Sequence, residues 1–377
     1  MYILHKCLHI NYNECIKGGF IMEKLDRIKG ALMGAFIGEA LGVGPHWYYD
    51  LKKLHKDYGT WIDDYTAPKK GRYHEGLKAG ALSQQGWLIQ KMTELIVKEQ
   101  GYSLDAFKTM LETDIFPHLD GTPMGGKGGY TSQVMRHIYY ERHVLKKDWK
   151  DVASLSDTTE SLERNIPLGL FYHNDLSNLS QQIAKNTALT QKDNVTGSLS
   201  VAYNVVLAFL ITGHALDESI SDKMMEKVHD KTLPFFAVTT TGLEVPNKRH
   251  TASKDEGLFA SPDALLSPAY MAASANDPDI KIEPAWKVSL VYGMPCAIYH
   301  MLPSVYYLAA RFKDDFESGV LHAINGGGQN QVRALLTGAL IGAQVGFKNI
   351  PKRFIEGLDD KENLLNLVED FARLIEK

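Results

Sequence analysis

Apolar residues recur with the period of a helix along most of this chain, and two of the helical stretches also carry glycine at every fourth position. Within residues 25–41 the apolar positions are three and four apart, which places them on one helix face. Residues 331–346 form the second such stretch. The glycines are Gly30, Gly34 and Gly38 in the first, and Gly338, Gly342 and Gly346 in the second. Residues four apart share a helix face, so we expect these two helices to pack closely against each other.

Further segments with helical spacing predict a mainly helical protein. They comprise the residues after 83–85 up to about 96, then 131–144, 198–211, and 285–312 with breaks at Pro295 and Pro303. The polar residues 52–81 and the glycine-rich residues 120–130 are predicted to be loops. No alternating strand pattern stands out. The sequence therefore predicts an all-α, single-domain helical bundle with loops converging on a central cleft.

Two segments differ from this pattern. Residues 1–21 have neither a regular helical pattern nor the apolar core of a signal peptide or membrane anchor. We expect them to be a non-native or disordered extension, with Met22 as the natural start and residues 22–377 as the domain. Residues 217–279 have the weakest pattern and are interrupted by five prolines. We interpret part of this segment as an irregular cap.

Composition narrows the class of protein. The 377 residues are 44% hydrophobic and 23% charged, as in soluble globular proteins, and residues 198–211 read as a core helix rather than a membrane span. A net charge of −4 gives no electrostatic support for binding nucleic acid or an anionic membrane. Three cysteines without a disulfide framework or metal spacing favour a cytoplasmic setting. We expect a small-molecule partner, and the oligomeric state stays open.

Candidate chemistry is concentrated around residues 325–331, which read NGGGQNQ. Glycines such as Gly327 and Gly328 allow backbone to approach a ligand closely. The long amides of Gln329 and Gln331 follow, directly before the second glycine-bearing helix. A polar loop attached to a buried helix can form a site, although a glycine turn before an ordinary core helix has the same pattern.

Several motifs together resemble the ADP-ribosylglycohydrolase superfamily, over most of the chain. They are RIKGALMGAFIGEALGVGPHWYYD, ALSQQG, IPLG, LTQ and NGGGQNQ, in that order. The continuation HWYYD is similar to the branch that contains the J-type crystallins of jellyfish lens. The resemblance implies a helical domain that acts on ADP-ribosyl substrates. It also implies two divalent metals, usually Mg²⁺, held by aspartate pairs of the first and last motifs.

Glutamine stands at all four of those aspartate positions, namely Gln84, Gln85, Gln329 and Gln331. Mg²⁺ prefers carboxylate oxygens, and a glutamine carbonyl brings no negative charge. We therefore expect no metal ligands and no cofactor. Decay of a dispensable site, a buried amide network that replaces the metals, and reuse of the pocket for sugar hydroxyls all fit this substitution.

Candidate catalytic residues are Glu39 and His46. Glu39 takes the family's aspartate position at the end of the first helix, where burial would raise its pKa; alternatively it hydrogen-bonds the backbone there. His46 could carry a proton near neutral pH, or be a packed loop residue. The acidic run at Glu160 and Glu163 could bring a base to the pocket, but such a run is more often a solvated face.

The expected ligand-binding residues come from the motifs and the loops beside them. They are Ser83, Gln84, Gln85, Asn325, Gly327, Gly328, Gln329, Gln331, Trp47 and Asp120. Trp47 could stack on a sugar or adenine face, although such aromatics are more often core anchors. Three functions remain open: a divergent hydrolase of an N-glycosidic ribosyl bond, a catalytically silent binder of a nucleotide or sugar, and a crystallin-like structural protein.

Overall fold

The computed structural model describes residues 12–235, 258–259 and 262–376. Within these residues all regular elements are helical, and β-pairing is limited to isolated bridges, so the all-α prediction is confirmed. The α-helices are α1 (Tyr12–Val43), α2 (Leu51–Tyr58), α3 (Gln84–Glu99), α4 (Leu104–Met110), α5 (Gln133–Ile138), α6 (Glu160–Arg164), α7 (Ile166–Phe171), α8 (Leu176–Thr190), α9 (Asn194–Ile211), α10 (Ile220–His229), α11 (Pro262–Asn276), α12 (Val288–Tyr292), α13 (Ile298–Arg311), α14 (Phe316–Asn325), α15 (Asn330–Val345), α16 (Lys352–Glu356) and α17 (Lys361–Glu376).

Short helices of other types join these elements. Two are π-helical, η2 (Leu111–Ile115) and η4 (Tyr139–Val144). Four are 3₁₀ turns: η3 (Phe116–His118), η5 (Trp149–Asp151), η6 (Ala285–Lys287) and η7 (Phe347–Asn349).

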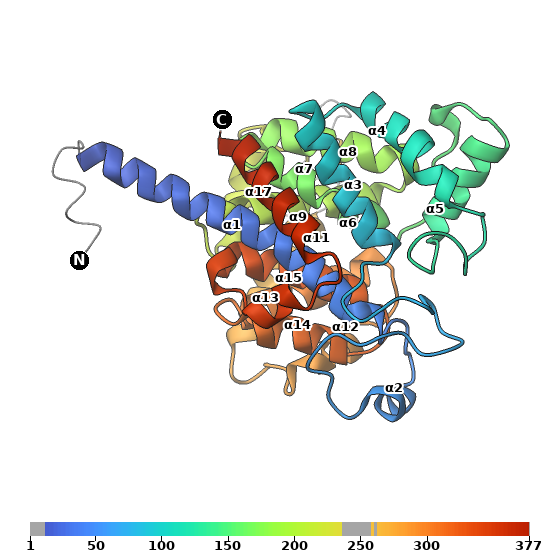
Figure 1. The fold of residues 1–377 in the computed structure, drawn as a ribbon. Helices are drawn as coiled ribbons and strands as arrows, with labels where there is room; N and C mark the ends of the chain where they lie inside the picture. The colour runs from blue at the N-terminus through green and yellow to red at the C-terminus, as the bar shows by residue number, and fades with distance from the viewer. Residues whose placement is uncertain (1–11, 236–257, 260–261, 377) are drawn as a thin grey trace, which may run out of the picture.

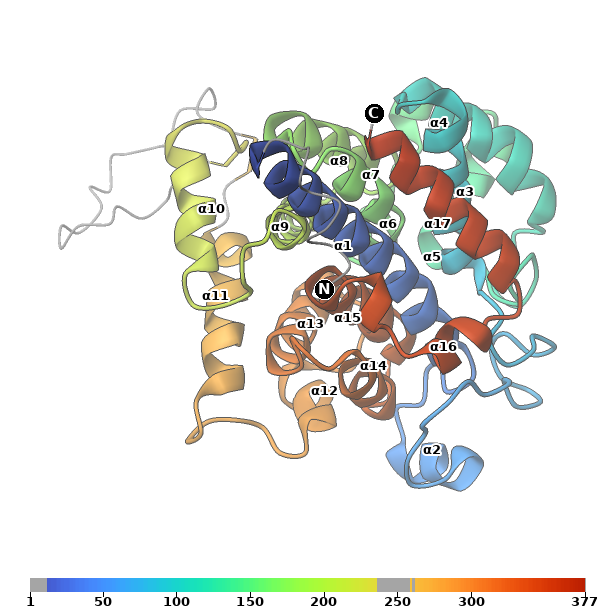
Figure 2. The same cartoon turned by 60° about the vertical axis from the view of Figure 1, so that its left-hand side comes forward.

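Helices α1 and α15 form the centre of the molecule, side by side (Figures 1 and 2). Their contact runs through the predicted glycines. A Cβ added at Gly30 would overlap the carbonyl oxygen of Gly342, and one at Gly34 would overlap that of Gly338. The two backbones therefore touch directly, which only residues without a side chain permit. The prediction that these two glycine faces are partners is confirmed.

The remaining helices pack around this pair. Helices α9, α13 and α14 contact α15, while α17 packs against both α1 and α3 (Figure 2). Helix α9 is long and apolar enough to cross a membrane, but 89% of it is buried inside the protein. The hydroxyl of Tyr203 on this helix donates to the carbonyl of Leu336 on α15 at 2.8 Å. The prediction of a core helix here is confirmed.

Several predicted boundaries are wrong. Helix α1 begins at Tyr12 rather than after Met22. Helix α2 lies in the predicted loop 52–81, because Asp50 accepts hydrogen bonds from the first backbone amides of a polar helix that shows little apolar periodicity. Pro303 does not break α13. It lies in the second turn of that helix, and the carbonyl that would accept its missing N–H belongs to Tyr299, an exposed residue.

The described part of the expected cap consists of two helices joined to short turns and an isolated bridge between Phe235 and Phe259. Helices α10 and α11 begin and end the segment 217–279, and α11 packs against α9 and α13. Residues 236–257 and 260–261 of this segment lie outside the described residues.

Candidate functional site

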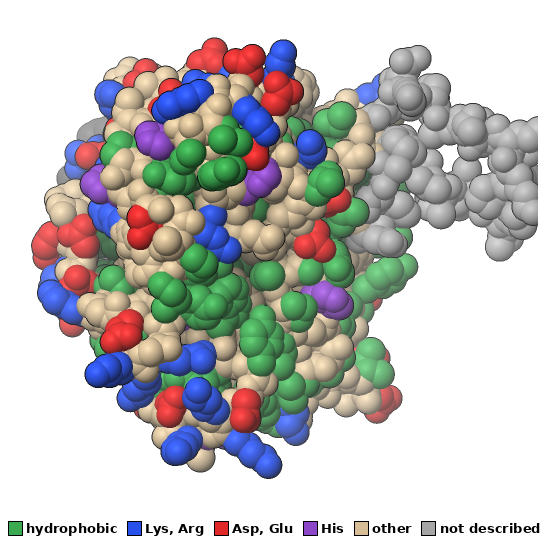
Figure 3. All heavy atoms as spheres, turned by 90° about the vertical axis from the view of Figure 1, so that its right-hand side faces the viewer, with side chains coloured by type: hydrophobic (Ala, Val, Ile, Leu, Met, Phe, Trp, Pro, Cys, Tyr) green, Lys and Arg blue, Asp and Glu red, His purple; other side chains and the backbone are tan. Residues whose placement is uncertain are grey.

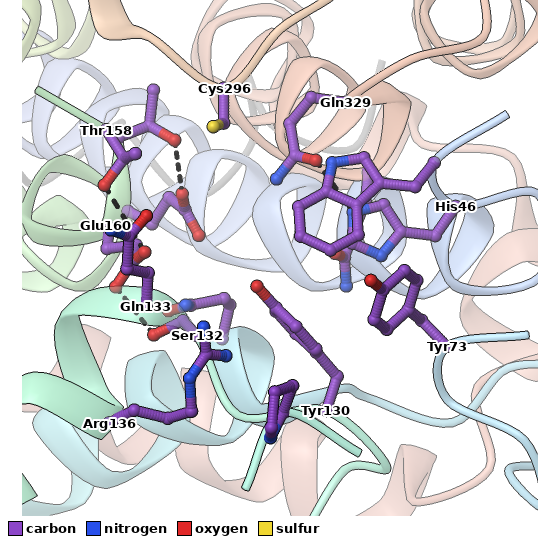
Figure 4. A pocket seen from close by; sticks show the side chains of 16 residues that line it. His46, Tyr73, Tyr130, Ser132, Gln133, Arg136, Thr158, Glu160, Cys296 and Gln329 are labelled. Carbon is purple, nitrogen blue, oxygen red and sulfur yellow. Dashed lines mark hydrogen bonds between the residues drawn. The ribbon is translucent and has the colours of Figure 1, made fainter. Parts of the chain in front are cut away.

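A cavity of about 220 Å³ opens where α1, α3, α6 and α15 approach one another. Figure 4 shows the side chains that surround it. They are His46, Trp47, Tyr73, Gln85, Pro123, Tyr130, Ser132, Gln133, Arg136, Thr158, Thr159, Glu160, Glu163, Cys296, Gln329 and Gln331. Because the glycine contact holds α1 against α15, the residues after α1 and those starting α15 form one wall. The residues of α6 form the opposite wall.

Glu39 joins the elements on the first wall. It is fully buried near the end of α1, and Nε2 of Gln331 donates to its Oε1 at 2.6 Å. The hydroxyl and backbone amide of Ser83 and the backbone amide of Gly86 also donate to this carboxylate. Burial raises the pKa of Glu39 to about 7, although these donors oppose the shift. The carboxylate is therefore engaged by protein donors at the start of α3.

His46 belongs to a directed chain of hydrogen bonds. Nδ1 of His74 lies 2.7 Å from the carbonyl of Gly128 and must donate to it. Burial lowers the pKa of His74 to about 4 and that of His46 well below its ordinary value, so both rings are neutral. His74 Nε2 can then only accept, and His46 Nδ1 donates to it at 2.6 Å.

This proton count leaves Nε2 of His46 as an acceptor. The side-chain amide of Gln329 lies 2.9 Å from that nitrogen, with its oxygen on the nearer side. Two acceptors cannot share a hydrogen bond, so we assign the donor role to the amide nitrogen of Gln329, which a half-turn of the amide brings to this position. The amide oxygen then points into the cavity, where Figure 4 shows the other end of this side chain.

Gln84 and Gln85 face different surroundings. The Gln84 carbonyl accepts from the backbone amide of Ser132 at 3.0 Å, and its nitrogen lies 3.4 Å from the Thr131 hydroxyl. Gln84 therefore fixes the segment that leads into α5. Gln85 lines the cavity, and its buried Oε1 has no hydrogen-bond partner among the described residues.

The glycine loop has the geometry that its sequence suggests. Gly327 and Gly328 have φ angles of 64° and 61°, which favour glycine. The amide of Gly328 donates to the carbonyl of Tyr48 at 2.8 Å, which ties this loop to the segment after α1. Arg333, fully buried, donates to the carbonyls of Gly327 and Ala323.

The second wall consists of acidic and hydroxyl residues of α6 and the turn before it. Glu163 is 1% exposed, its Oε1 accepts from the Thr159 hydroxyl at 2.7 Å, and its buried Oε2 has no partner in the described part of the chain. Burial raises the pKa of Glu163 to about 8, so it is mainly a neutral acid at pH 7. Glu160 accepts from the Ser132 hydroxyl and the Val134 amide at 2.6 and 3.1 Å, and burial raises its pKa.

Aromatic rings complete the cavity. Trp47 stacks on His46 and meets Tyr73 and Tyr130 edge-on, with ring centroids 4.6 to 5.0 Å apart. Its φ of 61° is unfavourable for a bulky residue, and backbone bonds to Gly328 and Arg72 hold it there. Its indole Nε1 is buried without a partner among the described residues.

The structure brings together only part of the residues expected from sequence. Trp47, His46, Gln85, Gln329 and Gln331 line the cavity. Behind it, Glu39, Ser83, Gln84, Gly327 and Gly328 support the wall through the contacts above. Asn325 binds the backbone of residue 62 with both amide atoms instead of facing the cavity. Asp120 is exposed and caps its own turn through Thr122.

The acidic wall was underestimated from sequence. The solvated-face interpretation of the run is wrong for Glu163, which is buried. Thr158 and Thr159 supply the hydroxyl donors that a buried carboxyl group needs, and these flanking residues were the available signal. Tyr73, Tyr130, Arg136 and Cys296 come from loops and short helices whose positions no local pattern fixes.

The residues around the cavity fit a two-magnesium cluster poorly. No group of three or more histidine, cysteine, aspartate or glutamate side chains in the described ranges is arranged to hold a metal ion. Of the four glutamines expected at metal-ligand positions, Gln84, Gln329 and Gln331 use their amides to bind Ser132, His46 and Glu39, and Gln85 offers only a neutral amide. Neutral amides that already serve protein partners do not offset two dications.

Comparison with known proteins adds three findings. A family model described as ADP-ribosylglycohydrolase matches residues 22–377. An uncharacterized protein of Archaeoglobus fulgidus is 24% identical over 350 residues, which span 93% of this chain and 97% of that protein. A solved structure described as an ADP-ribosylglycohydrolase-related protein complex superposes with a TM-score of 0.58 at 16% identity, covering 94% of this chain and 99% of that one. The last likeness concerns the fold alone.

Proposed function

The chain belongs to the ADP-ribosylglycohydrolase family, and from this premise we propose that it hydrolyses an N-glycosidic bond of a ribosyl substrate without the two-magnesium site. The observation that carries the proposal is Glu163. It is a carboxylic acid kept protonated by burial in a cavity wall, with one oxygen that has no hydrogen-bond partner in the described part of the chain. A group that can give up a proton near neutral pH is what departure of a nitrogen leaving group requires.

The proposed reaction uses the two acids of α6. Glu163 gives its proton to the leaving nitrogen, and the C–N bond breaks with its electron pair going to that nitrogen. A water molecule then attaches its oxygen to the anomeric carbon and passes a proton to Glu160. Oε1 of Glu160 is suited to this step because the hydrogen bonds it accepts from described residues are long, 3.3 Å from the Thr158 hydroxyl and 3.5 Å from the Val134 amide.

The two candidate catalytic residues expected from sequence, Glu39 and His46, have other roles in this proposal. Glu39 is engaged by donors from Ser83, Gly86 and Gln331, and His46 has both ring nitrogens in hydrogen bonds. We propose that Glu39 positions the side chain of Gln331 and that His46 positions that of Gln329. Gln85, Gln329 and Trp47 then bind the sugar.

The test is release of the free base from ribosides, followed by chromatography, with wild type and Glu163→Gln. We expect the variant to keep its helical content and lose about 100-fold or more of the rate, as expected for loss of a general acid. Glu94→Gln is the matched control, since Glu94 lies on α3 and contacts Gln90 and Lys91 rather than the cavity. Equal rates for wild type and Glu163→Gln would contradict the proposal.

A silent binder is the second candidate. The full engagement of Glu39 and His46 favours it, because neither offers a free atom to a substrate. Binding of a riboside without any release of base would establish this alternative. The crystallin-like structural role is less well supported, because side chains do not fill the cavity of about 220 Å³.

A further inference from the structure

We infer that the cavity takes a phosphate-free glycoside, one sugar ring with a small aglycone, and rejects ligands that bring a phosphate group into it. This inference rests on the proposed ribosyl pocket and specifies its ligand class. It follows from which groups are already occupied around the cavity, from the charges there and from the size of the space.

The N-terminus of α3, where a phosphate could bind, is occupied by a carboxylate of the protein itself. The N-terminus of a helix such as α3 attracts anions through its free backbone amides. Here the Ser83 and Gly86 amides donate to the Glu39 carboxylate at 3.1 and 3.3 Å. A ligand phosphate would have to displace a buried carboxylate that is fixed on the central helix.

The opposite wall repeats this arrangement. The hydroxyl of Ser132 and the amide of Val134, at the start of α5, donate to Glu160. Among the described residues that line the cavity, Arg136 is the only lysine or arginine, and its guanidinium donates to the carbonyl of Thr131. With Glu160 close by, the described lining of the cavity has no surplus of positive charge to offset a phosphate.

The groups left free match hydroxyls instead. Oε1 of Gln85 has no partner among the described residues, and Oε1 of Gln329 points into the cavity once its nitrogen binds His46. Neutral amide oxygens accept hydrogen bonds from sugar hydroxyls without a charge to compensate. Trp47 and Tyr130 offer ring surfaces for the apolar face of a sugar or base.

The volume of the cavity also favours a small ligand. Pockets that enclose drug-sized ligands measure about 300–1,000 Å³, whereas this cavity measures about 220 Å³. One sugar ring with a small aglycone is in keeping with that space. A dinucleotide-sized ligand would leave most of its surface outside the walls described above.

A matched pair of probes tests this inference. Calorimetric titration of the full chain with adenosine and with adenosine 5′-monophosphate compares ligands that share base and sugar and differ by one phosphate. We expect adenosine to bind at least about tenfold more tightly, because the phosphate meets carboxylates without a compensating cation. Methyl ribofuranoside and its 5-phosphate form a second pair that removes the base.

Variants locate the effect. Glu160→Gln removes the charge at the start of α5 and Glu39→Gln removes the one at α3, so either should bring the two affinities closer together. Glu94→Gln, the matched control elsewhere on α3, should leave their ratio unchanged. Monophosphate binding that equals or exceeds adenosine binding would overturn the inference, and so would binding of neither member of either pair.

The outcome separates this inference from the proposed reaction. Tight adenosine binding without release of base would leave the ligand class standing and reject the hydrolase. Hydrolysis of phosphorylated substrates in preference to neutral ones would support the hydrolase and reject the phosphate-free ligand class.

Discussion

The side-chain amide of Gln331 donates to the carboxylate of Glu39 across 2.6 Å, although 292 positions separate the two residues in the chain. Gln331 is the second residue of α15 and Glu39 lies near the end of α1, so this bond joins the two helices at one end of their glycine contact. An aspartate at position 331 would place a second negative charge against Glu39. That pair would need a cation, whereas the amide does not.

Backbone contact between the central helices predicts a strong response to a single methyl group. A Cβ on Gly342 would overlap the carbonyl of Gly30, so Gly342→Ala must push α1 and α15 apart. We expect a loss of at least about 1–3 kcal/mol in the free energy of unfolding, measured in urea. Gly101→Ala is the control, since its Cβ would meet nothing closer than 4.0 Å. Similar values for both variants would contradict the close packing.

The raised pKa values of Glu39 and Glu163 predict how stability depends on pH. Both carboxyls hold a proton more tightly in the folded protein than in the unfolded chain. Their contribution is complete below about 4.5 and is lost as pH rises through about 7 for Glu39 and about 8 for Glu163. In the Glu163→Gln variant, the contribution of Glu163 to this pH dependence of stability disappears.

Unfolding measurements on wild type and Glu163→Gln check this. The wild-type advantage over the variant should shrink by at least about 1 kcal/mol between about pH 5 and about pH 9. Glu362→Gln, which alters an exposed carboxylate of α17, should show no such trend. A difference between wild type and Glu163→Gln that stays constant with pH would show that Glu163 is ionised throughout.

The hydrogen-bond chain predicts one tautomer for His46. Because His74 donates to the Gly128 carbonyl, His46 should carry its only proton on Nδ1 at pH 7. Nitrogen-15 NMR of the imidazole distinguishes this form from the Nε2 tautomer and from the charged ring. Gln329→Glu should raise the pKa of His46, because a carboxylate then faces Nε2. Finding the Nε2 tautomer in wild type would reverse the assigned direction of the chain.

Gln84, Gln85, Gln329 and Gln331 also predict that Mg²⁺ does not change the thermal stability of the protein. We expect neither excess Mg²⁺ nor a chelator to change the melting temperature, since a ligand that binds only the folded form would raise it. Calorimetry under the same conditions should detect no uptake. A melting temperature that rises with Mg²⁺ would mean that other oxygens around the cavity complete a metal site.

Local sequence was informative where spacing alone decides the contact. Glycines four apart on α1 and α15 leave few packing alternatives, and the glycine loop needs its positive φ angles. Local sequence was uninformative where contacts between residues far apart in the chain decide whether a side chain is buried. Glu163 resembles a surface acid by its neighbours in sequence, and its burial follows from α6 packing against α3, α8 and α9.

The prediction for Asp120 is wrong in the opposite direction, because an exposed residue was expected to bind the ligand. Its position in a glycine-rich loop suggested a cleft residue, yet a short polar side chain can satisfy itself within its own turn. Asp120 does so with the amide and hydroxyl of Thr122, both at 2.8 Å. Tyr130, at the end of the same loop, is the residue that reaches the cavity (Figure 4). Figure 3 shows hydrophobic side chains exposed on one face of the molecule, among charged ones.

The glycine contact between α1 and α15 has a consequence for how such a protein can diverge. Main-chain atoms carry that contact, so the distance between the two helices does not depend on which side chains stand at their ends. Residues such as Gln329 and Gln331 can therefore be exchanged as a set while the scaffold keeps its dimensions. A chemistry can be lost, and a different one gained, on an unchanged frame.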